Sequence, residues 1–173
     1  MEVFFKHHSD SVKGYKAIDT HVRPLKTASN NRVLPITLDK HGRERIGFVK
    51  KSNFDSYLIY HQDPVFIQSL PDFHLPMLGA GSFRAFEIGD DSMHPIEIGS
   101  IVVGEYVQDW EKLPTGKTFT LLHKEYGLLF RRIYYQKNRS QLKLQAESKS
   151  YPPLLVKLNE ISEIWQARMF ISI

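Results

Sequence analysis

Short runs of apolar and β-branched residues alternate with polar turns along most of the chain, from Arg32 onward. Such runs are typical of β-strands, and the turn residues between them mark where one strand ends and the next begins. The runs fall at residues 32–38, 45–51, 82–88, 99–107, 117–123, 127–136, 141–147 and 161–173. Strands at intervals of roughly ten residues predict a mainly β fold, either a barrel or a sandwich.

Three of these runs carry a more specific prediction. The runs 117–123 and 127–136 flank a four-residue turn that ends in Gly127, so we expect them to form a hairpin. The apolar run 99–107 predicts a strand that is buried on both faces. The last run, 161–173, is long and apolar, and such a strand needs cover because an exposed edge of this kind invites association.

One short helix and an N-terminal arm complete the predicted organisation. Residues 63–70 favour a helix, with Asp63 as the N-cap and Pro64 at the first helical position. Residues 1–31 are polar and lack a regular apolar period, which indicates a flexible N-terminal arm or linker. They contain no pair of amphipathic helices of the kind that a helix-turn-helix requires. We therefore expect an arm over 1–31 and one domain over 32–173.

Composition narrows the classes of function. The chain has no cysteine, which excludes disulfides, cysteine nucleophiles and thiolate metal sites. It has no apolar run of about 18 residues, and its start does not resemble a secretory signal, so we expect a cytoplasmic protein with no membrane segment. The net charge of +4 is a mild excess and is weak evidence for nucleic-acid binding.

The eight histidines are scattered at wide spacing, and none forms a metal-binding pair on a convincing helix. We therefore expect neither a metal nor another cofactor. The best candidate for chemistry is Ser92, in the stretch "FEIGDDSMHPIEIGS". A Ser-His-Asp triad is disfavoured, because His94 is too near in sequence and no GxSxG motif is present.

A serine–lysine pair is the third possibility for Ser92. In such a pair a neutral lysine amine takes the proton of the serine, and burial in an apolar site lowers the lysine pKa enough for this. The lysine belongs on an apolar strand beside the serine. The obvious candidate strand, "GLLFRRIYY", carries Arg131 and Arg132 at its centre instead.

These segments together resemble a known family. The stretch "FRAFEIGDDSMHPIEIGSIVVGEYV", followed by "GKTFTLL", "GLLFRRI", "SKSYPP" and "ISEIWQARMFIS", is similar to the peptidase-like C-terminal domain of LexA and phage repressors, over about residues 32–173. The resemblance implies a LexA/signal-peptidase-like fold of short strands. It also implies that Ser92 holds the nucleophile position and that Arg131 holds the position of the general-base lysine.

Arg131 departs from the family pattern in a way that matters for catalysis. An arginine has a pKa above about 12 and stays protonated, so it cannot accept the proton of the serine. We expect an inactive site in which the hydroxyl of Ser92 caps its own turn or is held by Arg131. Met93 and Pro95 are then packing and turn residues.

The bond that the family cuts in its own chain is also missing. The family cuts an Ala-Gly bond, and alignment places the corresponding position at Asp55–Ser56, or with a small shift at Ser52–Asn53. No Ala-Gly pair occurs between Lys50 and Tyr60. The pair Ala80–Gly81 is interpreted as a loop. The alternative hypothesis is an active self-cleaving serine peptidase that uses Ser92 with a different lysine base, and the neighbouring hairpin offers Lys117 and Lys124.

The resemblance implies the regulatory and dimerisation domain of a repressor-type transcriptional regulator. We expect a homodimer, and DNA binding only through a DNA-binding segment that is not visible in this chain. Tyr106 and Trp110 are expected to cover a core edge rather than to bind a ligand. The loop Tyr151–Pro153 is expected to be rigid, with docking of a partner as the alternative.

Overall fold

The structure is a computed structural model that describes residues 34–135 and 140–172. The predicted arm over residues 1–31, and the prediction that it holds no helix-turn-helix, lie outside the described residues. Within the described residues no helix combines the length and the apolar character that a membrane span requires.

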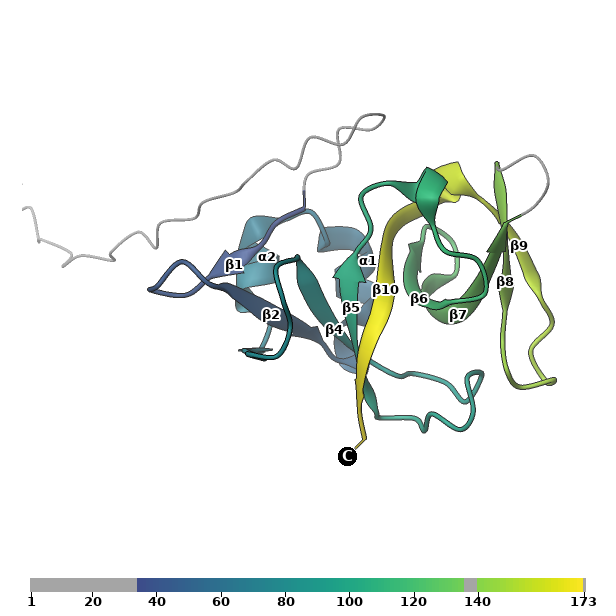
Figure 1. Ribbon diagram of the computed structural model, residues 1–173, viewed down its shortest axis with the longest axis horizontal. Helices are drawn as coiled ribbons and strands as arrows, with labels where there is room; N and C mark the ends of the chain where they lie inside the picture. Colours follow the sequence, from purple (N-terminus) through teal and green to yellow (C-terminus); the bar gives the residue numbers. More distant parts are fainter. Residues whose placement is uncertain (1–33, 136–139, 173) are drawn as a thin grey trace, which may run out of the picture.

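The described part of the chain is mainly β, as the sequence predicts (Figure 1). Its strands are β1 (Thr37–Leu38), β2 (Glu44–Val49), β3 (Asp72–Phe73), β4 (Phe83–Glu87), β5 (Ile101–Tyr106), β6 (Thr118–His123), β7 (Gly127–Tyr135), β8 (Gln141–Gln145), β9 (Leu154–Lys157) and β10 (Ile161–Ile171). Its helices are α1 (Phe54–Tyr60) and α2 (Pro64–Ser69), and its short 3-10 turns are η1 (Lys51–Asn53), η2 (Trp110–Lys112) and η3 (Leu158–Glu160). The predicted hairpin is formed by β6 and β7, with Leu121 opposite Leu129.

One continuous sheet contains these strands, in the order β1-β2-β4-β5-β10-β6-β7-β8-β9, with β3 paired to β2. The neighbouring strands are antiparallel except for β2 and β4, which are parallel. β10 runs through the middle of the molecule and joins the half that contains β2, β4 and β5 to the half that contains β6 to β9 (Figure 1).

The position of β10 in the sheet supplies most of the cover that its apolar sequence requires. The last strand is not an edge that lacks cover, because its first part is paired on both sides: Trp165 lies opposite Tyr106 of β5 and Thr120 of β6. Pairing with β6 ends at Gln166, and the remainder of the strand pairs only with β5 among the described residues. The apolar character of β10 is therefore explained mainly by its central place in the sheet.

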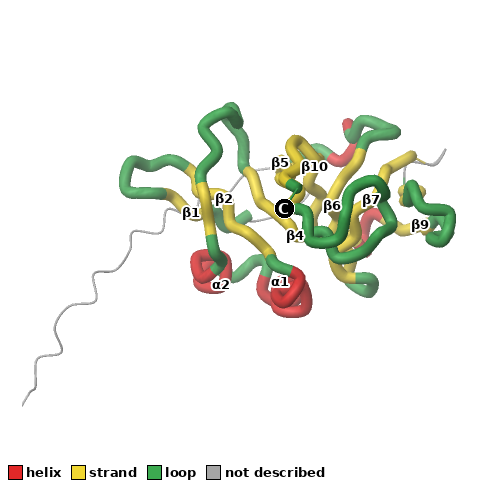
Figure 2. Tube along the Cα trace, turned by 90° about the horizontal axis from the view of Figure 1, so that it is seen from below, coloured by secondary structure: helices red, strands yellow, loops and turns green. Residues whose placement is uncertain are grey.

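Both α-helices lie on the same side of the β1–β2 half of the sheet (Figure 2). α2 is the helix that the sequence predicts, and the Asp63 side chain accepts a hydrogen bond from the Val65 amide at 2.9 Å. α1 was not predicted. Its sequence, "FDSYLIY", has weak helix propensity, and it is held by tertiary contacts instead, since Tyr57 is fully buried against the sheet.

The two halves of the sheet each have a core. One core lies between the helices and the sheet and includes Tyr57, Phe86 and Trp165, and the other lies within the β6–β9 half and includes Phe119 and Leu142. Trp110 belongs to the second core, and the ring of Tyr106 packs 5.1 Å from that of Trp165, as expected for residues at a core edge. In β5, Val102 and Val103 are fully buried, as its apolar run predicts.

A buried polar network fastens α1 to the sheet. The Tyr57 hydroxyl donates to Glu163 Oε2 at 2.5 Å, and Trp165 Nε1 donates to the same oxygen at 2.9 Å. Arg84 Nη1 donates to the Tyr57 hydroxyl at 2.7 Å, and Arg84 Nη2 donates to the Pro35 carbonyl at 2.8 Å. Burial alone would lower the pKa of Arg84, but Tyr57 and Glu163 raise it, so the guanidinium keeps its charge. The network thus satisfies most of the polar groups that α1 buries.

This network makes stability depend on pH in the alkaline range. Burial raises the pKa of Tyr57 well above its ordinary value of 10.0, although the charge of Arg84 opposes the shift. Above about pH 10 this tyrosine is ionised in the unfolded chain but not in the folded chain. The free energy of unfolding should therefore fall by about 1.4 kcal/mol per pH unit from this group alone. Tyr57→Phe should remove this part of the slope in urea unfolding series between pH 9 and 11 (about one unit on either side of the ordinary tyrosine pKa). Tyr60→Phe, a control on the exposed side of the same helix, should retain the slope, and equal slopes in both variants would contradict the assignment.

Candidate active site around Ser92

Ser92 lies in the turn-rich segment between β4 and β5 and is fully buried. Its amide donates to Asp90 Oδ1 at 3.1 Å, which closes a tight turn around the side chain. Its carbonyl accepts hydrogen bonds from the amides of Glu147 and Ser148, both at 2.9 Å. Met93 is buried in the first core and Pro95 lies in the turn, as the sequence predicts. Ser92 is therefore fixed on both sides by backbone hydrogen bonds.

Arg131 comes to Ser92 from β7, where it lies opposite Phe119 of β6. Only 5% of its surface is exposed. Its Nη1 donates to Ser92 Oγ and also to the Phe130 carbonyl, the second bond at 2.7 Å. The strand pairing and the turn thus bring together the two residues that the sequence singles out, and a permanent cation contacts the serine hydroxyl.

Asp90 is a third member of the site that sequence reasoning did not assign. Ser92 Oγ donates to Asp90 Oδ1, and Arg131 Nη2 contacts Asp90 Oδ2 at 3.3 Å. Burial would raise the pKa of Asp90, but the hydrogen bond from Ser92 and the charge of Arg131 together lower it. The signal in the sequence is the spacing, since an aspartate two residues before a serine commonly closes such a turn.

The two groups that contact the serine hydroxyl are both poor proton acceptors. Arg131 cannot accept a proton, because its guanidinium stays protonated. Asp90 receives the hydrogen bond of the hydroxyl, but a carboxylate with a lowered pKa is a weak base for a hydroxyl group. The arrangement holds the hydroxyl as a hydrogen-bonded structural group.

The loop after β8 closes over Arg131. The ring of Tyr151 lies 5.3 Å from the Arg131 guanidinium carbon, in a cation–π contact. The Tyr151 hydroxyl donates to Asp91 Oδ1 at 2.6 Å, and this bond is the main reason that the pKa of Tyr151 is raised. Glu147, at the start of the loop, pairs with Arg132. Tyr151 therefore contributes to holding Arg131 over the serine.

The lysines considered as alternative bases have other surroundings. Lys124 Nζ donates to the Asn159 carbonyl at 2.7 Å, at the far end of the β6–β7 hairpin, and Lys117 is exposed. Lys51, which the sequence did not single out, contacts the segment that carries Ser92. Its Nζ donates to the carbonyl of Gly89, the residue before Asp90, at 2.8 Å. Among the described residues, the side-chain hydroxyl of Ser92 is bonded to Asp90 and Arg131 rather than to any of these amines.

The positions expected for a cleaved bond are helical. Asp55–Ser56 lies inside α1, and Ser52–Asn53 lies in η1. A bond in either element is not displayed in the extended form that pairs with a strand edge. Ala80–Gly81 lies in the loop between β3 and β4, as expected for a loop pair.

No protein-family model matches this chain, and no curated protein matches it. Among the residues that the structure describes, no cluster of three or more His, Asp or Glu side chains could hold a metal ion.

Proposed function

We propose that this chain is the regulatory and dimerisation domain of a LexA-like, repressor-type transcriptional regulator whose serine–lysine peptidase site is inactive. The observation that carries the proposal is the hydrogen bond from Arg131 Nη1 to Ser92 Oγ. It occurs where the resemblance expects a lysine amine beside the nucleophile. An arginine there keeps the geometry of the pair and removes its proton acceptor.

The surroundings support a structural role for this pair. Asp90 neutralises Arg131, Tyr151 stacks on it, and the backbone of Ser92 is held by Glu147 and Ser148. A site that transfers the serine proton needs a neutral base within hydrogen-bond distance of the hydroxyl. In this proposal the cluster instead joins the Ser92 turn, β7 and the Tyr151 loop into one rigid unit.

The proposed dimer uses the part of β10 that pairs only with β5. Beyond Gln166 one side of the strand has no strand partner among the described residues. Phe170, in this part, is 44% exposed despite its contact with Phe130. A two-fold axis beside this segment would pair it with its own copy and cover the same patch in both subunits.

Sedimentation of the full chain at tens of micromolar should therefore show a dimer. Phe170→Glu should shift it to monomer, because two carboxylates would meet near the axis and lose their hydration. Leu155→Glu is the matched control, since Leu155 is 64% exposed on β9, the strand at one end of the sheet and away from β10, and the dimer should survive. A wild-type monomer at these concentrations, or equal effects of the two variants, would contradict the proposed interface.

In this proposal the described residues supply pairing and regulation in the cytoplasm. DNA recognition belongs to a DNA-binding segment that is not visible in this chain. The mild net charge of +4 is consistent with this proposal, because a chain with so small an excess of basic side chains can make few contacts to DNA phosphates.

A further inference from the structure

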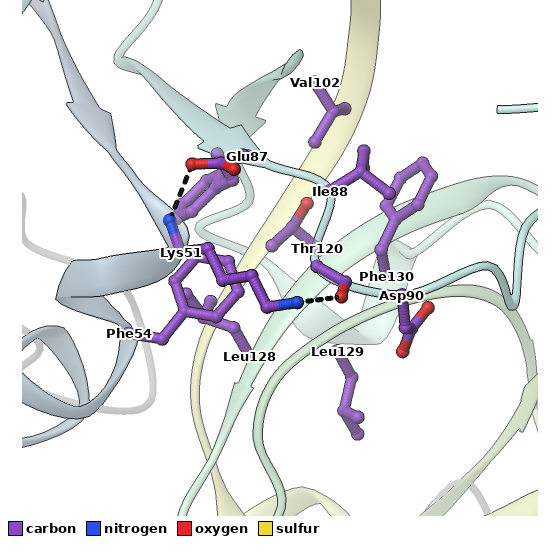
Figure 3. Close-up of a pocket in the computed structure, with 12 residues that line it drawn as sticks. Lys51, Phe54, Glu87, Ile88, Asp90, Val102, Thr120, Leu128, Leu129 and Phe130 are labelled. Atoms are coloured by element: carbon purple, nitrogen blue, oxygen red, sulfur yellow. Dashed lines mark hydrogen bonds between the residues drawn. The ribbon is translucent and has the colours of Figure 1, made fainter. Parts of the chain in front are cut away.

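A cavity of about 170 Å³ lies beside the Ser92 turn, between α1 and the sheet (Figure 3). Its walls are mainly apolar and come from Phe54 of α1, Ile88, Val102 of β5, and Leu128 and Phe130 of β7. Ser92 and Arg131 are not among its lining residues, but Asp90, which bonds to both of them, lines the cavity, so the cavity adjoins the serine–arginine pair without containing it. The cavity is open to solvent on one side, so a small molecule could enter it.

Thr120 gives this apolar wall one polar group without a partner. It lies on β6, lines the cavity, and is only 3% exposed. Its Oγ1 is buried and has no hydrogen-bond partner among the described residues. Because almost all buried polar side chains in native proteins are satisfied, an orphaned hydroxyl on a cavity wall points to a group that is absent from the free chain.

The mouth of the cavity is polar. The Lys51 amide donates to Glu87 at 2.8 Å, and the Lys51 side chain reaches across to the Gly89 carbonyl, also at 2.8 Å (Figure 3). Lys51 is exposed, so its amine can exchange this bond for water at little cost. The polar mouth and the apolar interior together are typical of a small-molecule site.

We propose that this cavity binds a small ligand made of one aromatic ring that carries one hydrogen-bonding oxygen. The size fits, since an apolar cavity of about 150 Å³ lined by Leu, Ile and Phe stays dry and binds benzene. The ring fills the space among Val102, Leu128 and Phe130, and the oxygen bonds to the Thr120 hydroxyl. This inference does not depend on the proposed function, because it uses neither the Ser92–Arg131 pair nor the dimer.

Phenol and toluene are the probes, because they have nearly the same shape and only phenol has the oxygen. Each is titrated into the ¹⁵N-labelled full chain while amide chemical shifts are followed. Both should bind, in the millimolar range or tighter, with the largest shifts at residues 86–90, 119–121 and 128–130. Phenol should bind more tightly than toluene, because only phenol satisfies Thr120.

Two variants separate what the Thr120 hydroxyl and the empty volume of the cavity each contribute to binding. Thr120→Val keeps the shape of the side chain and removes its hydroxyl, and it should weaken phenol binding about fivefold to tenfold while leaving toluene within about twofold. Leu128→Phe fills the cavity and should abolish binding of both probes. Leu155→Phe, the same change at an exposed site on β9, should leave both affinities unchanged.

Three results would overturn the proposal. They are no ligand-dependent shifts at the cavity residues in the folded wild type, equal loss of phenol and toluene affinity in Thr120→Val, and unchanged binding in a folded Leu128→Phe. If Leu128→Phe does not fold, the comparison of the two probes in Thr120→Val decides alone.

Discussion

Replacing Arg84 with Met should destabilise the fold by about 3–5 kcal/mol, the largest stability effect that we expect from a single substitution. Arg84 is 2% exposed, and its guanidinium lies 3.9 Å from the Glu163 carboxylate and over the ring of Trp165. Methionine would fill much of the same space but would leave Glu163 buried without a cation. An uncompensated buried charge is far more costly than the loss of a surface ion pair.

Arg168→Met is the matched control. Arg168 also lies on a strand and pairs with a glutamate, Glu105 at 2.6 Å, but its side chain is 45% exposed. Urea unfolding should show a loss below about 1 kcal/mol for this exposed pair. The double variant Arg84→Met, Glu163→Gln should recover much of the loss, because no unpaired charge then remains. A small effect of Arg84→Met, or no recovery in the double variant, would show that the network does not hold α1 as described.

Replacing Arg131 with Lys should turn Ser92 into a nucleophile. A lysine on β7 would place an amine beside the hydroxyl, and the apolar neighbours on the same face of the strand, Leu129 and Ile133, would lower its pKa. General-base assistance is worth about 10²–10⁴-fold, so labelling of Ser92 by a small organophosphorus fluoride should accelerate by a factor in that range. Asp90 would favour the charged amine, so adding Asp90→Asn should move the onset of labelling to lower pH.

Arg132→Lys is the control for position on the strand. Arg132 follows Arg131 but pairs with Glu147 instead of contacting the serine, so this variant should show no gain in labelling. Adding Ser92→Ala to Arg131→Lys should abolish the gain. A folded Arg131→Lys protein that labels no faster than the wild type would mean that the loss of the base is not what disables the site.

Features set by local pattern were predictable from the sequence. Alternation and turn residues predicted the β6–β7 hairpin, and the capping chemistry of Asp63 predicted α2. The meeting of Ser92 and Arg131 was also anticipated, from the resemblance rather than from any periodicity.

Features set by tertiary contacts were not predictable in the same way. α1 forms because Tyr57 is bonded to Glu163 and Arg84, two residues far away in the sequence. The central place of β10 depends on strand order, which apolar character alone does not determine. The cavity beside Thr120 arises from packing between α1 and four strands, β4 to β7, and the pattern of apolar and polar residues does not predict where such packing leaves a cavity.

The proposed absence of a base for Ser92 can be tested by measuring the intact mass of the full chain after prolonged incubation at alkaline pH. These conditions would deprotonate a lysine base if one served the serine. We predict a single species with the mass of the uncut chain, identical in the wild type and in Ser92→Ala. Fragments from a cut between Lys50 and Tyr60 in the wild type, absent in Ser92→Ala, would contradict the account.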